Sequence, residues 1–170
     1  MSWADLEAAA PELERAARSV IERDGFVYVG TVRRDGAPRI SPVEVHIVRG
    51  RLMLVMVAGS WKARDLARDP RVTLQSPVPN AADPGVEVKV RGRVTAVEEE
   101  QRAATADAVE ARSGWRPQVS WRFVAVDVEA VAALAWEHGE MVLTRWDREA
   151  GLRDPERRRL DAEASIYRPD

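Results

Sequence analysis

A short segment near the middle of the chain, Ser60-Trp61-Lys62, carries residue types that can bind an anion. Serine is a favoured N-cap, so Ser60 predicts the start of a helix whose first backbone N–H groups have no intrahelical acceptor. Those groups and the helix dipole attract negative charge, and Lys62 adds a full positive charge within the first turn. The segment therefore predicts a phosphate-binding site at the start of a short helix that Asp69-Pro70 closes.

Arg39 and Ser41 form a second candidate pair. They lie two residues apart in an apolar, β-branched run, and alternate residues of a strand point to the same face. A guanidinium and a hydroxyl on one face can hold a phosphate or another polar group of a ligand. A surface arginine beside a locally bonded serine explains the same two residues, and the residue types alone favour that simpler interpretation.

The other polar residues offer little for catalysis or metal binding. The chain has no cysteine, which excludes disulfides, thiolate metal sites and thiol nucleophiles. Its two histidines, His46 and His138, show no ligand spacing, so we expect neither a bound metal nor a Ser-His-Asp triad. Asp65 and Asp69 stand one helical turn apart, and a solvated helix face explains them better than acid–base chemistry. Any catalytic residues stay unknown, and a cofactor would carry the difficult chemistry.

Three apolar runs surround these candidates and predict antiparallel strands at residues 26–32, 40–48 and 52–57. Asp35-Gly36 and Arg49-Gly50 separate the runs, and glycine favours tight turns because it adopts positive φ. Such short connections exclude parallel crossovers, which need about a dozen residues or more. The candidate site is therefore expected on a β meander that leads directly into the helix beginning near Ser60.

Further elements are expected on both sides of this meander. Residues 3–23 carry the apolar stripe of a helix, and Pro11 means either that the helix starts near Ala10 or that a short leading helix bends there. Strands are expected at 71–76, 86–97, 121–128, 131–137 and 141–146, with a helix from 98 to 112. The proline-rich segment 76–85 is a loop and a candidate lid. The charged tail is either helical around 155–164 or frayed.

The order of these motifs resembles the flavin- and deazaflavin-binding split β-barrels, the relatives of pyridoxamine 5′-phosphate oxidase. The resemblance is carried by P-R-x-S-P at residues 38–42, the third strand, and S-x-K-x-x-x-L-x-x-D-P-R-V at residues 60–72, and it covers about residues 20–97. It implies a mainly β fold with flanking helices, an antiparallel split β-barrel of the FMN-binding type with six to seven strands. It also implies a homodimer, because the family builds its cofactor cleft between two barrels.

Carried over to this sequence, the resemblance implies a set of cofactor-binding residues. Ser60 and Lys62 would hold the phosphate, and the backbone at Val55 and Met56 would meet the ring system. The whole set comes from two strands and the first turn of the helix: Arg39, Ser41, Val43, Val55, Met56, Ser60, Trp61 and Lys62.

Two features depart from the oxidases themselves. Trp61 stands where they usually carry an arginine beside the lysine, so its indole can stack on a cofactor or fill a dimer interface but cannot bind phosphate as a cation. The chain also lacks their arginine-rich terminal substrate motif, and both departures argue against vitamin B6 oxidation. Trp136 and Trp146, on late strands, either cover a flavin from a second subunit or anchor the core or an interface.

Three functional hypotheses follow. The first is an FMN- or deazaflavin-dependent oxidoreductase that transfers a hydride to or from a small organic substrate. The alternative is a non-catalytic split barrel that binds a flavin, haem or another flat ligand. The third is an interaction dimer whose cleft is empty.

Length and composition bound these hypotheses. With 170 residues, of which 45% are hydrophobic and 32% charged, the chain suits one soluble domain. We expect a helix at 1–24, a barrel with inserted helices at 25–147 and a charged tail at 148–170. The net charge of −2, with acids and bases interleaved, argues against nucleic-acid binding. Neither a leader nor an apolar run of membrane length is evident, so a cytoplasmic protein is expected.

Overall fold

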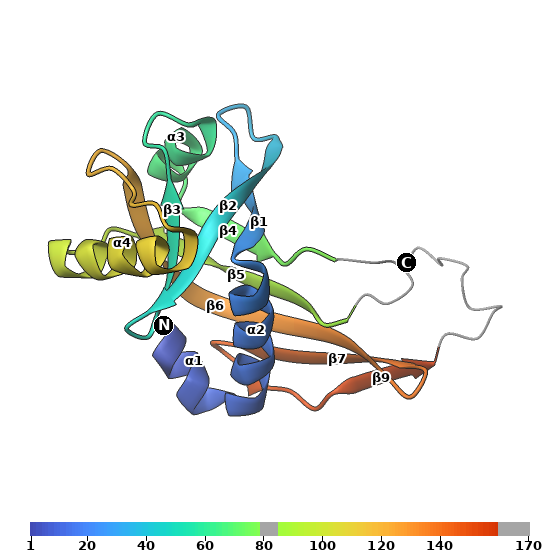
Figure 1. The fold of residues 1–170 in the computed structure, drawn as a ribbon. Helices are drawn as coiled ribbons and strands as arrows, with labels where there is room; N and C mark the ends of the chain where they lie inside the picture. The colour runs from blue at the N-terminus through green and yellow to red at the C-terminus, as the bar shows by residue number, and fades with distance from the viewer. Residues whose placement is uncertain (79–84, 160–170) are drawn as a thin grey trace.

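The computed structural model describes residues 1–78 and 85–159 of the chain. The helices are α1 (Trp3–Ala9), α2 (Pro11–Asp24), α3 (Trp61–Arg68) and α4 (Glu99–Ser113). The strands are β1 (Phe26–Val32), β2 (Pro38–Val48), β3 (Arg51–Met56), β4 (Arg71–Gln75), β5 (Glu87–Thr95), β6 (Arg122–Glu137), β7 (Glu140–Asp147), β8 (Gly151–Leu152) and β9 (Glu156–Arg159) (Figure 1). The predicted lid falls mostly on residues 79–84, which lie outside the described residues.

Six strands close into an antiparallel barrel in the order β3-β2-β1-β4-β5-β6, and β3 pairs with β6 to complete the ring. The predicted meander is confirmed, and its three strands differ from the expected ranges by at most two residues at each end. Gly36 and Gly50 occupy the connecting turns at φ values of 83° and 70°, which side-chain-bearing residues rarely adopt. The predicted antiparallel barrel with flanking helices is therefore confirmed.

Strand β6 is longer than the sequence indicated. Two strands were expected, at 121–128 and 131–137, but β6 runs without a break from Arg122 to Glu137. The two-strand prediction was wrong because the polar interruption is a β-bulge, where Arg91 pairs with Ala130 and Gly92 pairs with Val128. The extra residue between them is Glu129. A Cβ at Gly92 would lie 2.2 Å from the Asp127 carbonyl oxygen, so the bulge requires glycine.

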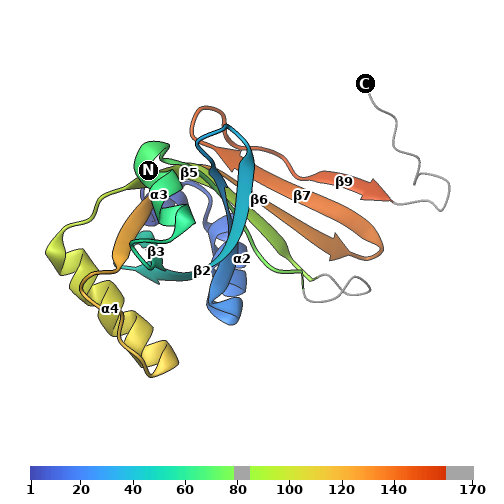
Figure 2. The same ribbon diagram turned by 90° about the horizontal axis from the view of Figure 1, so that it is seen from above.

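Beyond the barrel, β6 continues together with β7 and β9 as a projecting part of the sheet (Figures 1 and 2). Strands β8 and β9 both pair with β7. Neither alternative for the tail, a helix around 155–164 or a frayed segment, was right for β9, and residues 160–164 lie outside the described residues. Arg157, Arg158 and Arg159 are exposed along this last described strand.

The N-terminal segment forms two helices that meet at Pro11, as the leading-helix interpretation predicted. Pro11 is the first residue of α2, where the missing N–H costs nothing. The apolar faces of both helices join the main core inside the barrel, with Trp3, Leu6 and Ile21 almost fully buried. A second cluster lies under α4 and contains Val55, Ala106, Val109 and Phe123.

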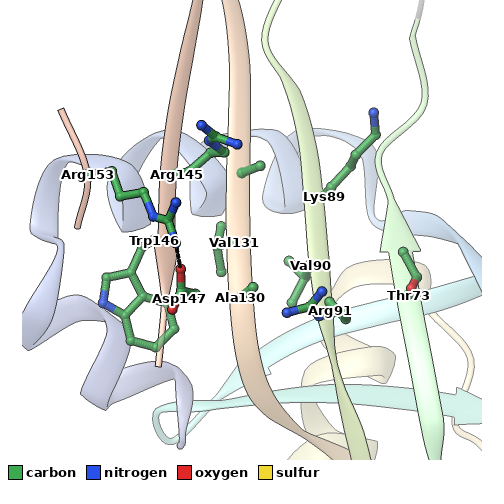
Figure 3. Close-up of a pocket in the computed structure, with 11 residues that line it drawn as sticks. Thr73, Lys89, Val90, Arg91, Ala130, Val131, Arg145, Trp146, Asp147 and Arg153 are labelled. Atoms are coloured by element: carbon green, nitrogen blue, oxygen red, sulfur yellow. Dashed lines mark hydrogen bonds and ion pairs between the residues drawn. The ribbon is translucent and has the colours of Figure 1, made fainter. Parts of the chain in front are cut away.

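The strand register aligns residues into rows on the outer face of the sheet, some of which Figure 3 shows. Paired residues of neighbouring antiparallel strands point to the same face. One row crosses β2, β1, β4, β5, β6 and β7 through Ile40, Gly30, Thr73, Arg91, Ala130 and Asp147. The next row contains Pro42, Tyr28, Gln75, Lys89, Ala132 and Arg145.

Candidate functional site

Helix α3 begins where the sequence predicted. Ser60 is its N-cap, with extended φ and ψ of −67° and 153°, and its hydroxyl accepts a hydrogen bond of 3.4 Å from the Ala63 N–H. Within the part of the chain that the structure describes, the backbone N–H groups of Trp61 and Lys62 make no hydrogen bond. Lys62 likewise has no ion-pair partner among the described residues. The first turn of α3 therefore offers donors and a cation to a ligand.

Trp61 projects from this turn and is 64% exposed. The guanidinium carbons of Arg39 and Arg64 lie 5.7 and 5.1 Å from the centre of its indole ring. Such distances are typical of cation–π contacts. Where the oxidases carry an arginine, this chain therefore has an indole that packs against two arginines from other positions.

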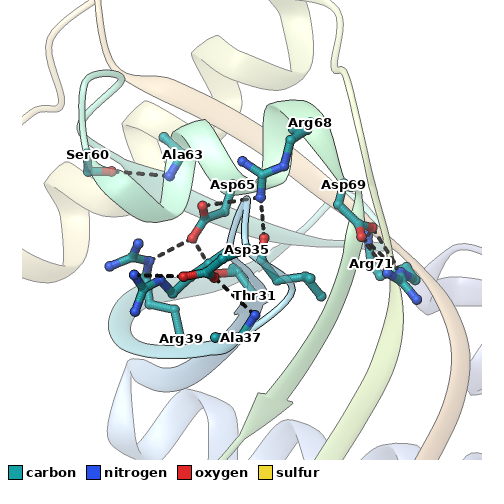
Figure 4. A network of polar contacts seen from close by, with 12 residues as sticks. Thr31, Asp35, Ala37, Arg39, Ser60, Ala63, Asp65, Arg68, Asp69 and Arg71 are labelled. Carbon is teal, nitrogen blue, oxygen red and sulfur yellow. Dashed lines mark hydrogen bonds and ion pairs between the residues drawn. The ribbon is translucent and has the colours of Figure 1, made fainter.

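Asp65 organises the polar contacts beneath α3 (Figure 4). Its carboxylate accepts hydrogen bonds from Arg39 Nε at 2.6 Å, Thr31 Oγ1 at 3.1 Å and Arg68 Nη2 at 3.4 Å. The expectation of a solvated helix face was wrong for Asp65, which is 4% exposed. Buried carboxylates need such donors, and these come from two neighbouring strands and the helix itself. Asp65 thus fixes Arg39 against α3.

Hydrogen-bond donors lower the pKa of both Asp65, in α3, and Asp69, its C-cap. Burial raises the pKa of Asp65, but the hydrogen bonds from Arg39, Thr31 and Arg68 and the charge of Arg39 outweigh it, so its pKa lies below the ordinary value. For Asp69, hydrogen bonds from the side chain and backbone N–H of Arg71 lower the pKa to about 2. Both carboxylates are therefore ionised at neutral pH and unsuited to serve as a general acid.

The structure separates the predicted strand residues into the half-buried Arg39 and Ser41 and a buried group. Burial alternates along the first part of β2, so that Arg39 and Ser41 share one face, as predicted, and Val43 lies on that face too. Val43 and Met56 belong to the main core, while Val55 faces the second cluster under α4. Because these three side chains are buried, a ligand would meet their backbone, as the resemblance implied for Val55 and Met56. Their binding roles stay predictions.

Two overlapping grooves lie on the sheet beside this site. One, of about 470 Å³, is lined by Arg39 and by the arginines Arg71, Arg91 and Arg93. The other, of about 380 Å³, is lined by Tyr28, Gly30, Ile40, Thr73 and Gln75, and it shares Gly30, Ile40 and Thr73 with the first. Arg39 therefore connects the α3 turn to an open groove.

Several functional candidates were not evident from the sequence. The hydroxyl-bearing Tyr28, 41% exposed, lines the second groove and is a candidate proton donor. The contact of Thr31 with Asp65 joins residues 34 positions apart. The sequence could have identified Thr31 as a neighbour of Arg39, because the Asp35-Gly36 hairpin places Thr31 directly opposite Arg39.

His46 and Trp146 are buried, whereas Trp136 is exposed. His46 is 7% exposed, and burial lowers its pKa despite the nearby Glu44 carboxylate. Across residues 1–78 and 85–159, no group of three or more His, Asp or Glu side chains could hold a metal ion. Trp146 is a core residue at 3% exposure, which favours the anchor interpretation for it, while Trp136 is 42% exposed.

Comparisons with known proteins agree with this fold. The family profile described as pyridoxamine 5′-phosphate oxidase matches residues 13–137. No curated protein sequence matches significantly. Among the described residues, the structure contains no candidate for a membrane-spanning helix.

Several solved structures are similar in fold. A haem-binding protein from Mycobacterium smegmatis is 24% identical with a TM-score of 0.60, over 76% of this chain and 56% of its own. PhzG from Burkholderia lata 383, in complex with tetrahydrophenazine-1-carboxylic acid, is 12% identical with a TM-score of 0.61, over 92% and 91% of the two chains. An F420 reductase is 20% identical with a TM-score of 0.55, over 67% and 94%. By its profile match and its six-stranded barrel, the chain belongs to the pyridoxamine 5′-phosphate oxidase family of split barrels.

Proposed function

We propose that this protein is an FMN- or deazaflavin-dependent oxidoreductase that holds the phosphate of its cofactor at the first turn of α3. The observation that carries the proposal is the presence of three kinds of donor in or beside this turn. These are the backbone N–H groups of Trp61 and Lys62, which have no acceptor among the described residues, the ammonium of Lys62 and the guanidinium of Arg39. Family membership supplies the expectation that such a turn receives a phosphorylated cofactor.

The residues present fit a cofactor phosphate. Arg39 engages Asp65 through Nε, and in the described part of the chain its two terminal nitrogens have no hydrogen-bond partner. A guanidinium oriented in this way keeps N–H groups for a second anion. Trp61 offers an exposed indole face beside them. Arg39 thus supplies the second cation that the sequence lacks at position 61.

When bound, a flavin or deazaflavin supplies the hydride chemistry. The protein's part is to bind and orient the cofactor and to limit the access of water. Ser60 fixes the helix start, Lys62 and Arg39 neutralise the phosphate, and the buried Val55 and Met56 set the strand backbone beside the ring. Tyr28 is the proton donor in this proposal, since it lines the adjacent groove.

A homodimer is part of the proposal. Ile40 is 74% exposed, and Tyr28 and Phe26 are 41% and 39% exposed on the same region of β1 and β2. Exposed apolar groups on neighbouring strands favour burial against a second copy. The groove of about 380 Å³ would then become an enclosed cleft.

The arginines of the groove of about 470 Å³ favour a second candidate, a non-catalytic barrel that binds haem or another flat anion. Propionate groups would pair with such side chains. The haem-binding neighbour makes this hypothesis concrete, although its likeness extends to the fold alone.

The absorbance spectrum of the purified protein, followed by calorimetric titration with FMN, riboflavin, deazaflavin and haem, tests both candidates. The oxidoreductase proposal expects FMN or the deazaflavin to bind, with FMN much tighter than riboflavin, which has no phosphate. A Soret band without flavin affinity would support the haem candidate. No affinity for any of these ligands would refute both.

A further inference from the structure

A third groove, of about 410 Å³, lies on the outer face of the sheet over β4, β5, β6 and β7 (Figure 3). None of its lining residues belongs to α3. Its position therefore differs from that of the proposed phosphate site.

The register explains why the sheet is hollow there. Lys89, Ala132 and Arg145 are consecutive in one row across the sheet. In the adjacent row, Arg91, Ala130 and Asp147 follow in the same order. In these two rows β6 contributes the methyl groups of Ala130 and Ala132, while the strands on both sides contribute charged side chains, three of them long. The result is an apolar floor between polar walls, with a volume suited to a small molecule.

The walls are mainly basic. Lys89 pairs with Glu87 at 2.8 Å, and Arg153 pairs with Asp147 at 2.9 Å. Arg145 likewise pairs with Glu156. Arg91 is different, because no acidic side chain of the described residues pairs with it. The groove therefore presents one arginine whose charge the neighbouring carboxylates leave unpaired.

We propose that this groove binds an organic anion with a flat apolar body, and that Arg91 binds its carboxylate or phosphate group. The two alanines provide the surface on which the flat body lies. A cation would face four basic side chains, Lys89, Arg91, Arg145 and Arg153, against the single lining acid Asp147. A neutral ligand would leave Arg91 without a partner, so charge sets the ligand class.

Arg91 and Thr73 also line the groove of about 470 Å³. A bound anion would therefore lie beside the groove that Arg39 enters. The proposal nevertheless stands without the flavin hypothesis, because neither the first turn of α3 nor Arg39 takes part in the contacts.

Calorimetric titration of the whole protein with 2-naphthoate and with its neutral analogue 2-naphthamide tests the proposal. The naphthoate is expected to bind more tightly. Arg91→Gln should weaken naphthoate binding by about tenfold to a hundredfold, as expected for one charge-assisted hydrogen bond, and leave naphthamide unchanged. Arg34→Gln is the matched control, because Arg34 is an exposed arginine of the β1–β2 turn outside the groove.

A second variant tests the floor. Ala132→Leu fills the space between Lys89 and Arg145 and should weaken the binding of both probes, with the melting temperature confirming that the fold persists. Four outcomes would overturn the proposal. They are no naphthoate binding at millimolar concentration, equal affinity for both probes, equal losses in Arg91→Gln and Arg34→Gln, and unchanged binding in a folded Ala132→Leu variant. A parallel FMN titration reports on the oxidoreductase proposal separately.

Discussion

Asp65 sets the direction of Arg39, and through it the charge available beside α3. A carboxylate with 4% exposure and three donors has little freedom to reorient. The guanidinium that it holds is consequently preorganised, which reduces the entropy that a bound anion would have to offset. Arg39 thus reaches the first turn of helix α3 from strand β2.

Asp65→Asn is expected to destabilise the fold by about 2 kcal/mol, within the range for hydrogen bonds to charged groups. The pKa of Asp65 is lowered in the folded state, so its contribution is complete above the ordinary value of 3.8 and declines as the pH falls below it. Urea unfolding of the wild type and of Asp65→Asn at pH 7 and pH 3 measures the difference in their free energies of unfolding. The stability difference should be smaller at pH 3, and a constant difference would contradict the assignment.

Lys62→Ala should weaken FMN binding by about tenfold to a hundredfold, because a phosphate there loses a charge-assisted hydrogen bond. Riboflavin, which has no phosphate, is the matched ligand and should bind the two proteins equally. Titration calorimetry compares the four combinations. Equal FMN affinities would place the phosphate elsewhere.

How much of this site the sequence predicts depends on the distance between partners along the chain. Ser60 and Lys62 are adjacent to the helix that they start, so local rules identify them. The Arg39–Asp65 contact joins residues 26 positions apart, and no local pattern specifies which strand lies beneath which helix. Asp65 was consequently mistaken for a solvated residue.

At the scale of elements, the same distinction separates the strands that were predicted correctly from β6. Glycine turns define β1, β2 and β3 within a few residues, because a tight turn is a local property. The break expected in β6 reflects a bulge, and bulges depend on the register with a partner strand, here β5. Likewise, β9 pairs with β7, and a charged sequence gives no sign of that partner.

Gly92→Ala tests the bulge. The new Cβ would lie 2.2 Å from the Asp127 carbonyl oxygen, and a backbone atom of a central strand cannot move away cheaply. We expect a loss of about 3 kcal/mol or more, as for severe overpacking. Thermal unfolding monitored by circular dichroism provides the measurement. Gly59→Ala is the control, since a Cβ at Gly59 would meet no described atom within 4 Å, and similar losses in both variants would argue against the bulge explanation.

At the scale of the molecule, the exposed apolar groups of β1 and β2 require explanation. The proposed homodimer predicts twice the chain mass of 19.0 kDa in light scattering. Ile40→Glu places a charge at the most exposed of these positions and should yield the monomer. Val119→Glu is the control, because Val119 is 84% exposed in the loop before β6 and should leave the mass unchanged. A wild-type monomer at micromolar concentration would contradict the proposal.

The arginines of β9 have a consequence for the handling of the protein. An edge strand with open backbone groups can pair with the same edge of another copy, which is a route to aggregation. Arg157, Arg158 and Arg159 line that edge with charged side chains, which pair with Glu137, Glu140 and Glu156. Charged side chains on an edge strand discourage such pairing between copies. Aggregation through the β9 edge is therefore not expected in concentrated stocks of the protein.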